Sequence, residues 1–350
     1  MDIFELFRHT YDAKASDLHI TVGIPPVIRA NGSLRSLAYE ALTPTDVMSL
    51  LQQIMKPVQL KELENKHELD FSFSHSGFGR FRVNVYKQRG TFSAAFRSVM
   101  GRIPSIEELG LPPVINELTS KQRGLILVTG PTGSGKTTTL AYMIDKMNHE
   151  RKSHIITLED PIEYLYKHDQ CIINQREVGS DVDSFSNGLR AALRQDPDVI
   201  LVGEMRDLET ISIAVTAAET GHLVLSTLHT VGAAKTIDRI VDVFPPHQQQ
   251  QIRIQLSTVL EGIVSQQLLP TADQKSRTVA VEVMLANNAI RNLIRENKTY
   301  QIQNVIQTGA KQGMQTMDGS LLSLYRQGTI TQEDVFKYCM ETDIVRRYIN

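Results

Sequence analysis

The stretch Gly-Pro-Thr-Gly-Ser-Gly-Lys-Thr at residues 130–137 decides how this chain folds. It fits the pattern G-x-x-x-x-G-K-[ST], a loop whose backbone N–H groups converge on phosphate groups. The apolar run at 125–128 precedes it like a buried strand, and residues 136–148 follow it with a helix-compatible pattern. A helix start adds the positive end of its dipole to such a loop. Strand, loop and helix together predict a nucleotide phosphate site.

Two residues of this loop are expected to carry its chemistry. Lys136 is expected to reach the β- and γ-phosphates of ATP, and Thr137 is expected to offer its hydroxyl to Mg²⁺. The residues expected to hold the nucleotide are Gly130, Pro131, Thr132, Gly133, Ser134, Gly135, Lys136, Thr137 and Thr138.

Composition narrows the class of protein. The chain of 350 residues is long enough for two domains, and its formal net charge of −2 gives no overall electrostatic case for nucleic acid or an acidic membrane. The first residues do not resemble a signal peptide, and no apolar stretch is long enough to span a bilayer. Cys171 and Cys339 cannot form a C-x-x-C zinc pair. We expect a cytosolic protein without zinc.

The pattern of residues 1–102 predicts a small α+β domain. A capping residue and a proline at Thr43-Pro44 predict the start of one helix, and the turn Asn31-Gly32 separates short strand patterns. Alternating patterns predict further strands at 70–74, 79–86 and 91–99. Residues 103–113, with prolines and a glycine, are the expected linker.

The remainder of the chain divides at about residue 287. Between 114 and 286, helical stretches alternate with apolar strand patterns, which predicts a parallel α/β sheet. These strands are expected at 125–128, 154–158, 199–202 and 223–227. Residues 287–350 are mostly helical in pattern.

Acidic residues follow two of the predicted strands, and ligands of open α/β sheets bind at the carboxyl ends of strands. Glu159 and Glu163 follow the second strand and are candidates to hold Mg²⁺ through water and to orient the attacking water; the alternative is a solvated turn. Glu204 follows the third strand at the place of a Walker B acid, where Gly203 fills the usual aspartate position. Glu204 is therefore expected to bind Mg²⁺, partly through water, or to polarise water, alone or with the other two acids.

Histidines and arginines complete the candidate site. His229 follows the fourth strand, where an imidazole can sense the γ-phosphate, and His222 precedes that strand; a lone histidine is more often structural. Arg80 and Arg82 share a face of a predicted strand, and Arg97 lies on the next one. Arginines on that face can neutralise charge during phosphoryl transfer, in the same or a neighbouring subunit, unless the face is simply solvated.

With these residues in place, nearly the whole chain resembles the type II/IV secretion ATPases, most closely those that retract type IV pili. Residues 15–20 and 23–26 resemble the PAS-like domain of that family. Residues 159–163 resemble its aspartate box, 203–207 its atypical Walker B motif, and 226–230 its histidine box.

A fifth motif resembles the signature of the retraction motors. It is a candidate for passing motion on to a partner, and its pattern also fits an amphipathic helix with Ile290, Leu293 and Ile294 on one side. The motif comprises Ala289, Ile290, Arg291, Asn292, Leu293, Ile294, Arg295 and Glu296.

The resemblance implies a RecA-like ATPase core behind the PAS-like domain, in a homohexameric cytoplasmic ring that hydrolyses ATP with Mg²⁺. The angle between the domains would change about residues 103–113. The ring would act at the inner face of the cytoplasmic membrane on a platform protein of the PilC type, and thereby indirectly on the pilin fibre, with no direct nucleic-acid contact expected.

Three alternatives differ in partner or chemistry. Extension and type II secretion ATPases are similar but usually carry an extra N-terminal domain and a C-x-x-C zinc pair, which this sequence does not show. A DNA translocase predicts a basic, aromatic channel, against which the near-neutral charge and the absence of tryptophan weigh. A regulator that does not hydrolyse nucleotide would not need Lys136, Thr137 and Glu204 together.

Overall fold

The computed structural model describes residues 1–30, 32–99 and 102–349. The chain divides into two compact units, one formed by Met1–Arg102 with Glu163–Leu165 and the other by Ile103–Ile162 with Tyr166–Asn350. Each unit has its own hydrophobic core. The turn predicted at Asn31-Gly32 includes Asn31, which lies outside the described residues.

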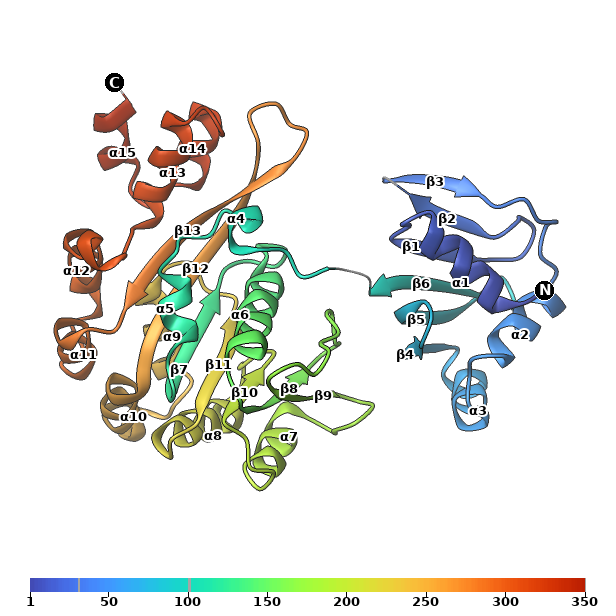
Figure 1. The fold of residues 1–350 in the computed structure, drawn as a ribbon, viewed down its shortest axis with the longest axis horizontal. Helices are drawn as coiled ribbons and strands as arrows, with labels where there is room; N and C mark the ends of the chain where they lie inside the picture. Colours follow the sequence, from blue (N-terminus) through green and yellow to red (C-terminus); the bar gives the residue numbers. More distant parts are fainter. Residues whose placement is uncertain (31, 100–101, 350) are drawn as a thin grey trace. The chain divides into compact units, whose positions relative to one another are not determined.

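In the described part of the first unit, a six-stranded sheet has the order β3-β2-β1-β6-β5-β4 (Figure 1). Its neighbouring strands pair antiparallel. Helix α1 buries Phe7 against the sheet, where its ring stacks on that of Phe81 at a centroid distance of 4.2 Å. The elements are α1 (Ile3–Asp12), β1 (Asp17–Ile20), β2 (Val27–Ala30), β3 (Ser33–Ser36), α2 (Pro44–Gln52), α3 (Pro57–Lys66), β4 (Glu68–His75), β5 (Gly79–Gln88) and β6 (Thr91–Val99).

Local sequence explains why α2 begins where it does. The Thr43 hydroxyl accepts a hydrogen bond from the Asp46 N–H, and the Asp46 carboxylate accepts one from the Thr43 N–H. This reciprocal cap satisfies two N–H groups that the helix itself leaves free.

Edge strand β3 and helix α3 were not predicted. Strand β3 is exposed at every residue, so it lacks the alternation that marks a half-buried strand.

The second unit contains a seven-stranded sheet, as far as its residues are described, with the order β13-β12-β7-β11-β10-β8-β9 (Figure 1). Its strands are β7 (Gly124–Thr129), β8 (His154–Glu159), β9 (Ile172–Glu177), β10 (Val199–Val202), β11 (Leu223–Leu228), β12 (Leu260–Pro270) and β13 (Arg277–Leu285). The predicted parallel sheet is confirmed for the four expected strands. Strands β9, β12 and β13 were not predicted, and β13 pairs antiparallel with β12.

Helices cover both faces of this sheet. Leu125 and Leu127 of β7 belong to the core beneath α8 (Leu208–Glu219), α9 (Ala233–Asp242) and α10 (Pro246–Val259). Ile126 and Val128 belong to the core beneath α5 (Ile115–Thr119) and α6 (Lys136–Glu150). Each fully buried side chain of this size stabilises the fold by about 1.5–3 kcal/mol. The sheet is thus a rigid support for the loops at its carboxyl edge.

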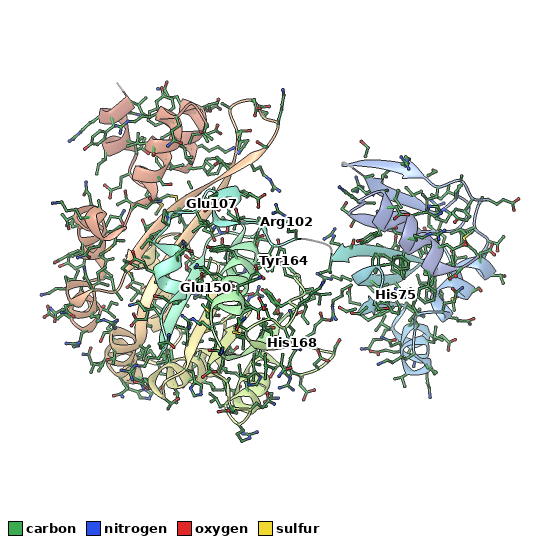
Figure 2. All side chains as sticks on the ribbon, viewed as in Figure 1. His75, Arg102, Glu107, Glu150, Tyr164 and His168 are labelled. Carbon is green, nitrogen blue, oxygen red and sulfur yellow. The ribbon has the colours of Figure 1, made fainter. Side chains whose placement is uncertain are left out.

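The segment predicted as a linker, residues 103–113, is packed into the second unit. It contains the short helix α4 (Ile106–Leu109), and both Ile106 and Leu111 are buried in the core beneath α6. Glu107 lies on this helix (Figure 2) and accepts a hydrogen bond of 2.8 Å from the hydroxyl of Ser105. An open linker would not bury apolar side chains in this way.

The predicted helical C-terminal region is confirmed, and α13 to α15 form a separate group at the end of the chain, drawn red in Figure 1. Across residues 1–30, 32–99 and 102–349, no helix combines the length and the apolar character needed to cross a bilayer. The remaining α-helices are α7 (Phe185–Ala192), α11 (Asn288–Arg295), α12 (Ile302–Thr308), α13 (Met317–Arg326), α14 (Gln332–Tyr338) and α15 (Thr342–Ile349).

Candidate active site

The glycine-rich loop joins the carboxyl end of β7 to the start of α6. Gly130 has a φ of +141°, and a Cβ at this position would lie 2.2 Å from the backbone oxygen of Gln266 on β12. Only glycine tolerates both the backbone angle and this close approach. Gly135, with a φ of +88°, turns the chain directly into α6. The glycines therefore bring backbone N–H groups and a helix start to one place.

Lys136 lies within the loop and is 8% exposed. Its ammonium donates hydrogen bonds to the carbonyl oxygens of Gly130 at 2.8 Å and Pro131 at 3.0 Å. Thr137 and Thr138 follow in the first turn of α6, both half-buried. Ser134 is buried, while Pro131, Thr132 and Gly133 are exposed at the tip of the loop.

A carboxylate and an imidazole from neighbouring strand ends meet beside this loop. Glu204 follows β10 and His229 follows β11, and Nε2 of His229 lies 3.0 Å from Oε1 of Glu204. Nδ1 of the same imidazole lies 3.4 Å from the hydroxyl of Thr132. The structure thus brings Glu204, His229 and Thr132 together at one edge of the sheet.

Arg206 is a further member of this group, and no role was predicted for it from the sequence. Its Nε donates a hydrogen bond to Oε1 of Glu204, and this bond together with the carboxylate charge raises the pKa of Arg206. Its position in the motif Gly-Glu-Met-Arg-Asp at residues 203–207 could have indicated a role at this site. A cavity of about 440 Å³ adjoins the group, lined by residues that include Glu204, Arg206, His229 and Arg239.

Gly203, which fills the usual aspartate position of the Walker B motif, packs closely against the end of β8. The N–H of Gly203 donates a 2.8 Å hydrogen bond to the carbonyl of Leu158 at the end of β8. A Cβ on Gly203 would lie 3.1 Å from that oxygen and 3.5 Å from Cα of Glu159. A side chain at residue 203 would be crowded by β8, and the carboxylate at this strand end comes from the next residue, Glu204.

The other two candidate acids occupy different environments. Glu159, at the end of β8, is 5% exposed, and its Oε1 accepts hydrogen bonds from the hydroxyl of Thr157 at 2.6 Å and from Nε2 of Gln175 at 3.1 Å. Glu163 is exposed and groups with the first compact unit. Of the three candidate acids, Glu204 is the one with a recorded contact to His229.

His222 lies at the opposite end of β11 from His229. Its Nδ1 is 2.9 Å from the carbonyl of Ala217 and 3.3 Å from the hydroxyl of Thr220. The strand begins at Leu223 and ends at Leu228, so the length of β11 separates the two histidines. The structure does not bring His222 to the phosphate loop.

The three candidate arginines share one face of the sheet in the first unit, as expected. Arg82 on β5 is directly opposite Arg97 on β6 in the antiparallel register. Arg97 Nε pairs with Oδ1 of Asp17 at 3.1 Å, and Arg80 Nη1 donates to the hydroxyl of Ser74 at 3.2 Å. Arg82 and Arg97 are exposed.

Residues 289–295 of the motif lie in α11 and Glu296 follows its last residue, and the expected amphipathic character is confirmed, because all three apolar positions pack against the same core. Ile290 and Ile294 are fully buried, and Leu293 is half-buried. Arg291 faces the protein, where Nη1 donates to the carbonyls of Ser257 at 2.9 Å and Thr258 at 2.6 Å. The exposed residues of the motif are Ala289, Asn292, Arg295 and Glu296.

The site offers oxygen donors to a magnesium ion. The hydroxyl of Thr137 and the carboxylate of Glu204 are the ligand types that Mg²⁺ prefers, and Mg²⁺ at phosphate sites commonly uses few protein ligands together with phosphate oxygens. Among the residues that the structure describes, no group of three or more His, Cys, Asp or Glu side chains could hold a metal on its own. The chemistry therefore fits an ion held jointly with a nucleotide.

A phosphate loop between strand and helix, with a carboxylate and an imidazole from adjacent strand ends, defines a P-loop nucleotide-binding protein. Residues 102–337 match the family model described as Type II/IV secretion system protein. The chain belongs to this family, which confirms the predicted resemblance.

Relatives cover nearly the whole chain. It is 49% identical to the Type IV pilus retractation ATPase PilT of Pseudomonas aeruginosa, over 95% of this chain and 97% of that protein. It is 40% identical to the Type IV pilus ATPase PilU of the same organism, over 100% of this chain and 91% of that protein. A crystal structure of the pilus retraction motor PilT with bound ADP has a TM-score of 0.92 and 50% identity, covering 99% of each chain. The ATPase DotB of Legionella pneumophila has a TM-score of 0.82 at 28% identity, covering 96% of this chain and 95% of that one.

Proposed function

We propose that this protein is an ATP-hydrolysing motor that powers type IV pilus retraction. The observation that carries the proposal is the full-length similarity to a retraction ATPase in a chain that keeps Lys136, Glu204 and His229 at one site. The similar structure with bound ADP supports a nucleotide on the loop at residues 130–137. The chain is also 40% identical to PilU, so its relatives include a second pilus ATPase.

The loop residues would act first by binding. Lys136 would exchange the carbonyls of Gly130 and Pro131 for phosphate oxygens, and the N–H groups at the start of α6 would face the same phosphates. Thr137 would hold Mg²⁺ through its hydroxyl, together with Glu204 through water. The ion supplies positive charge against the charge that develops on the transferred phosphoryl group.

Glu204 is the candidate base that orients the attacking water. Its partners His229 and Arg206 hold the carboxylate beside the loop, whereas Glu159 already accepts hydrogen bonds from Thr157 and Gln175. His229 contacts both Glu204 and Thr132, so a change at the tip of the loop reaches the carboxylate through one side chain. Such a link suits a residue that reports whether the γ-phosphate is present.

Assembly and location follow from the family resemblance. We propose a cytoplasmic homohexamer in which residues 1–102 form a PAS-like domain, 114–286 the RecA-like core and 287–350 the helical region. Arg80, Arg82 and Arg97 on the first unit are candidates to neutralise phosphate charge. The partner would be a PilC-like platform protein at the inner membrane, contacted through the exposed side chains of α11.

The site is tested by replacing Glu204 and Lys136 separately with alanine. E204A is expected to lose nearly all ATP hydrolysis while still binding a fluorescent ADP analogue, and K136A is expected to lose binding as well. Glu62→Gln, which alters an exposed ion pair on α3, is the matched control and should retain both activities. An active E204A variant would move the role of base to Glu163.

A further inference from the structure

The start of α9 is held by side chains from two neighbouring strands. Gly232, at the cap position, has a φ of +92°, and within the described residues no side chain of this turn caps the helix. Instead, the Gly232 N–H donates to the hydroxyl of Ser265 at 2.9 Å, and the Ala233 N–H donates to Oε1 of Glu282 at 2.8 Å. Both are N–H groups that a helix start leaves without an internal partner.

Glu282 is a buried carboxylate that reaches three helices. It is 1% exposed on β13, directly opposite Ser265 of β12 in the antiparallel register. Its Oε2 accepts hydrogen bonds of 3.4 Å from the N–H of Met317, the first residue of α13, and from Nε2 of Gln303 on α12. Burial raises the pKa of Glu282, and its hydrogen bonds from Ala233, Met317 and Gln303 oppose that rise. Burying a carboxylate is costly unless donors surround it in this way.

The same helix start carries the loop that bears His229. Residues 229–232 connect β11 to α9, and the Thr236 hydroxyl donates to the carbonyl of Gly232 at 2.8 Å and lies 2.7 Å from the hydroxyl of Thr230. Few backbone torsions therefore separate Ala233 from His229. Hydrogen bonds of Thr230 and Gly232 hold the loop between them. The position of α9 sets where the imidazole meets Glu204.

We propose that Glu282 is a positioning residue for the candidate active site. One oxygen fixes the start of α9 and thereby the aim of His229 at Glu204, while the other oxygen binds the C-terminal helices. The inference rests on the proposed role of His229, and it adds a residue that contacts neither nucleotide nor metal.

The test compares Glu282→Gln and Ser265→Ala in the full-length protein. Glutamine keeps the volume, but its NH₂ group must face either the N–H of Ala233 or the two donors from Met317 and Gln303, so at least one hydrogen bond is lost. We expect kcat to fall about tenfold in both variants, because small misplacement of catalytic groups is costly. We expect the KM for ATP and the affinity for ADP to stay within about twofold, because the phosphate loop is not altered.

Asp318 provides the matched control. It is also a buried carboxylate of the C-terminal region, and it accepts hydrogen bonds from the N–H groups of Met340 at 2.6 Å and Glu341 at 3.0 Å, not from α9. Asp318→Asn should leave kcat within about twofold, whatever it does to stability. An equal loss of kcat in this variant would overturn the proposal, because it would reflect general disruption of the region.

A double-variant cycle tests the role of Glu282 separately from the role of His229. If Glu282 acts through His229, E282Q should cause no further loss of kcat in a His229→Ala background. The positioning role would be overturned if the kcat losses of E282Q and H229A multiplied in the double variant. It would also be overturned if kcat were unchanged in both E282Q and S265A. Wild-type kcat in H229A alone would instead contradict the proposed role of His229. If E282Q fails to fold by circular dichroism, S265A, which removes only a hydroxyl, carries the test.

Discussion

Replacing Arg291 with alanine measures how far the α11 motif supports the fold. The side chain donates to the carbonyls of Ser257 and Thr258 and pairs with Oε1 of Glu261 at 2.8 Å. These carbonyls lie at the end of α10, where a helix leaves its last C=O groups without internal partners. One guanidinium therefore closes the end of α10 and joins it to the start of β12.

The magnitude follows from these contacts. A hydrogen bond to a charged group contributes about 1.5–3 kcal/mol, and an exposed ion pair at most about 1 kcal/mol. Arg291 is 22% exposed, and Glu261 keeps a second partner, Lys121, at 2.8 Å, so the three contacts do not add in full. We expect R291A to lower the free energy of unfolding by about 3 kcal/mol. For domains of this size, that corresponds to a fall in Tm of roughly 6–12 °C.

Thermal unfolding of the full chain, followed by circular dichroism, checks this value. Arg295→Ala is the control, because Arg295 is an exposed residue of the same helix and its loss should cost no more than about 0.5 kcal/mol. At temperatures where R291A is folded, we expect ATP hydrolysis to persist, because none of the lost contacts involves the phosphate loop. Equal melting temperatures for R291A and R295A would show that the contacts of Arg291 do not stabilise the fold.

Two further predictions concern the metal and a helix cap. Thr137→Ala should raise the Mg²⁺ concentration needed for half-maximal hydrolysis, and EDTA should abolish hydrolysis until Mg²⁺ is restored; activity that persists in EDTA would contradict the assignment of Thr137. Asp207→Ala should destabilise the protein by about 1 kcal/mol at neutral pH, because Asp207 caps α8 through the N–H of Thr210 at 2.8 Å. Desolvation raises the pKa of Asp207, but hydrogen bonds from Thr210 outweigh it and leave the pKa below its ordinary value. Because the pKa of Asp207 is lower in the folded protein, the stability that the carboxylate adds is lost as the pH falls through that pKa. The difference in free energy of unfolding between D207A and wild type, measured in urea, should therefore disappear at low pH. A difference that persisted at low pH would contradict this cap.

The sequence was sufficient to predict the central strands and the loops between them. β7, β8, β10 and β11 are buried along their length, so each appears as a short apolar run followed by polar residues. The parallel arrangement then requires their carboxyl ends to share an edge, which is why Glu204 and His229 could be expected together. Strand β12 is also almost continuously buried, but at eleven residues its length is equally compatible with a buried helix.

Partners distant along the chain could not be predicted. Glu282 and Ala233 are separated by 49 positions, and nothing in the residues around either one indicates the other. Arg291 could be recognised as part of a helix, but its inward direction depends on where α10 ends. His222 and His229 both flank a strand, and only the direction of β11 distinguishes the end that carries the phosphate loop.

Whether this protein powers the withdrawal of pili can be measured in its host. The gene is deleted in its host, surface pili are counted and twitching is recorded, with wild-type and Glu204→Ala genes returned separately. We expect excess pili without twitching in the deletion strain, and recovery with the wild-type gene but not with E204A. Loss of pili in the deletion strain would contradict this expectation and indicate an extension motor.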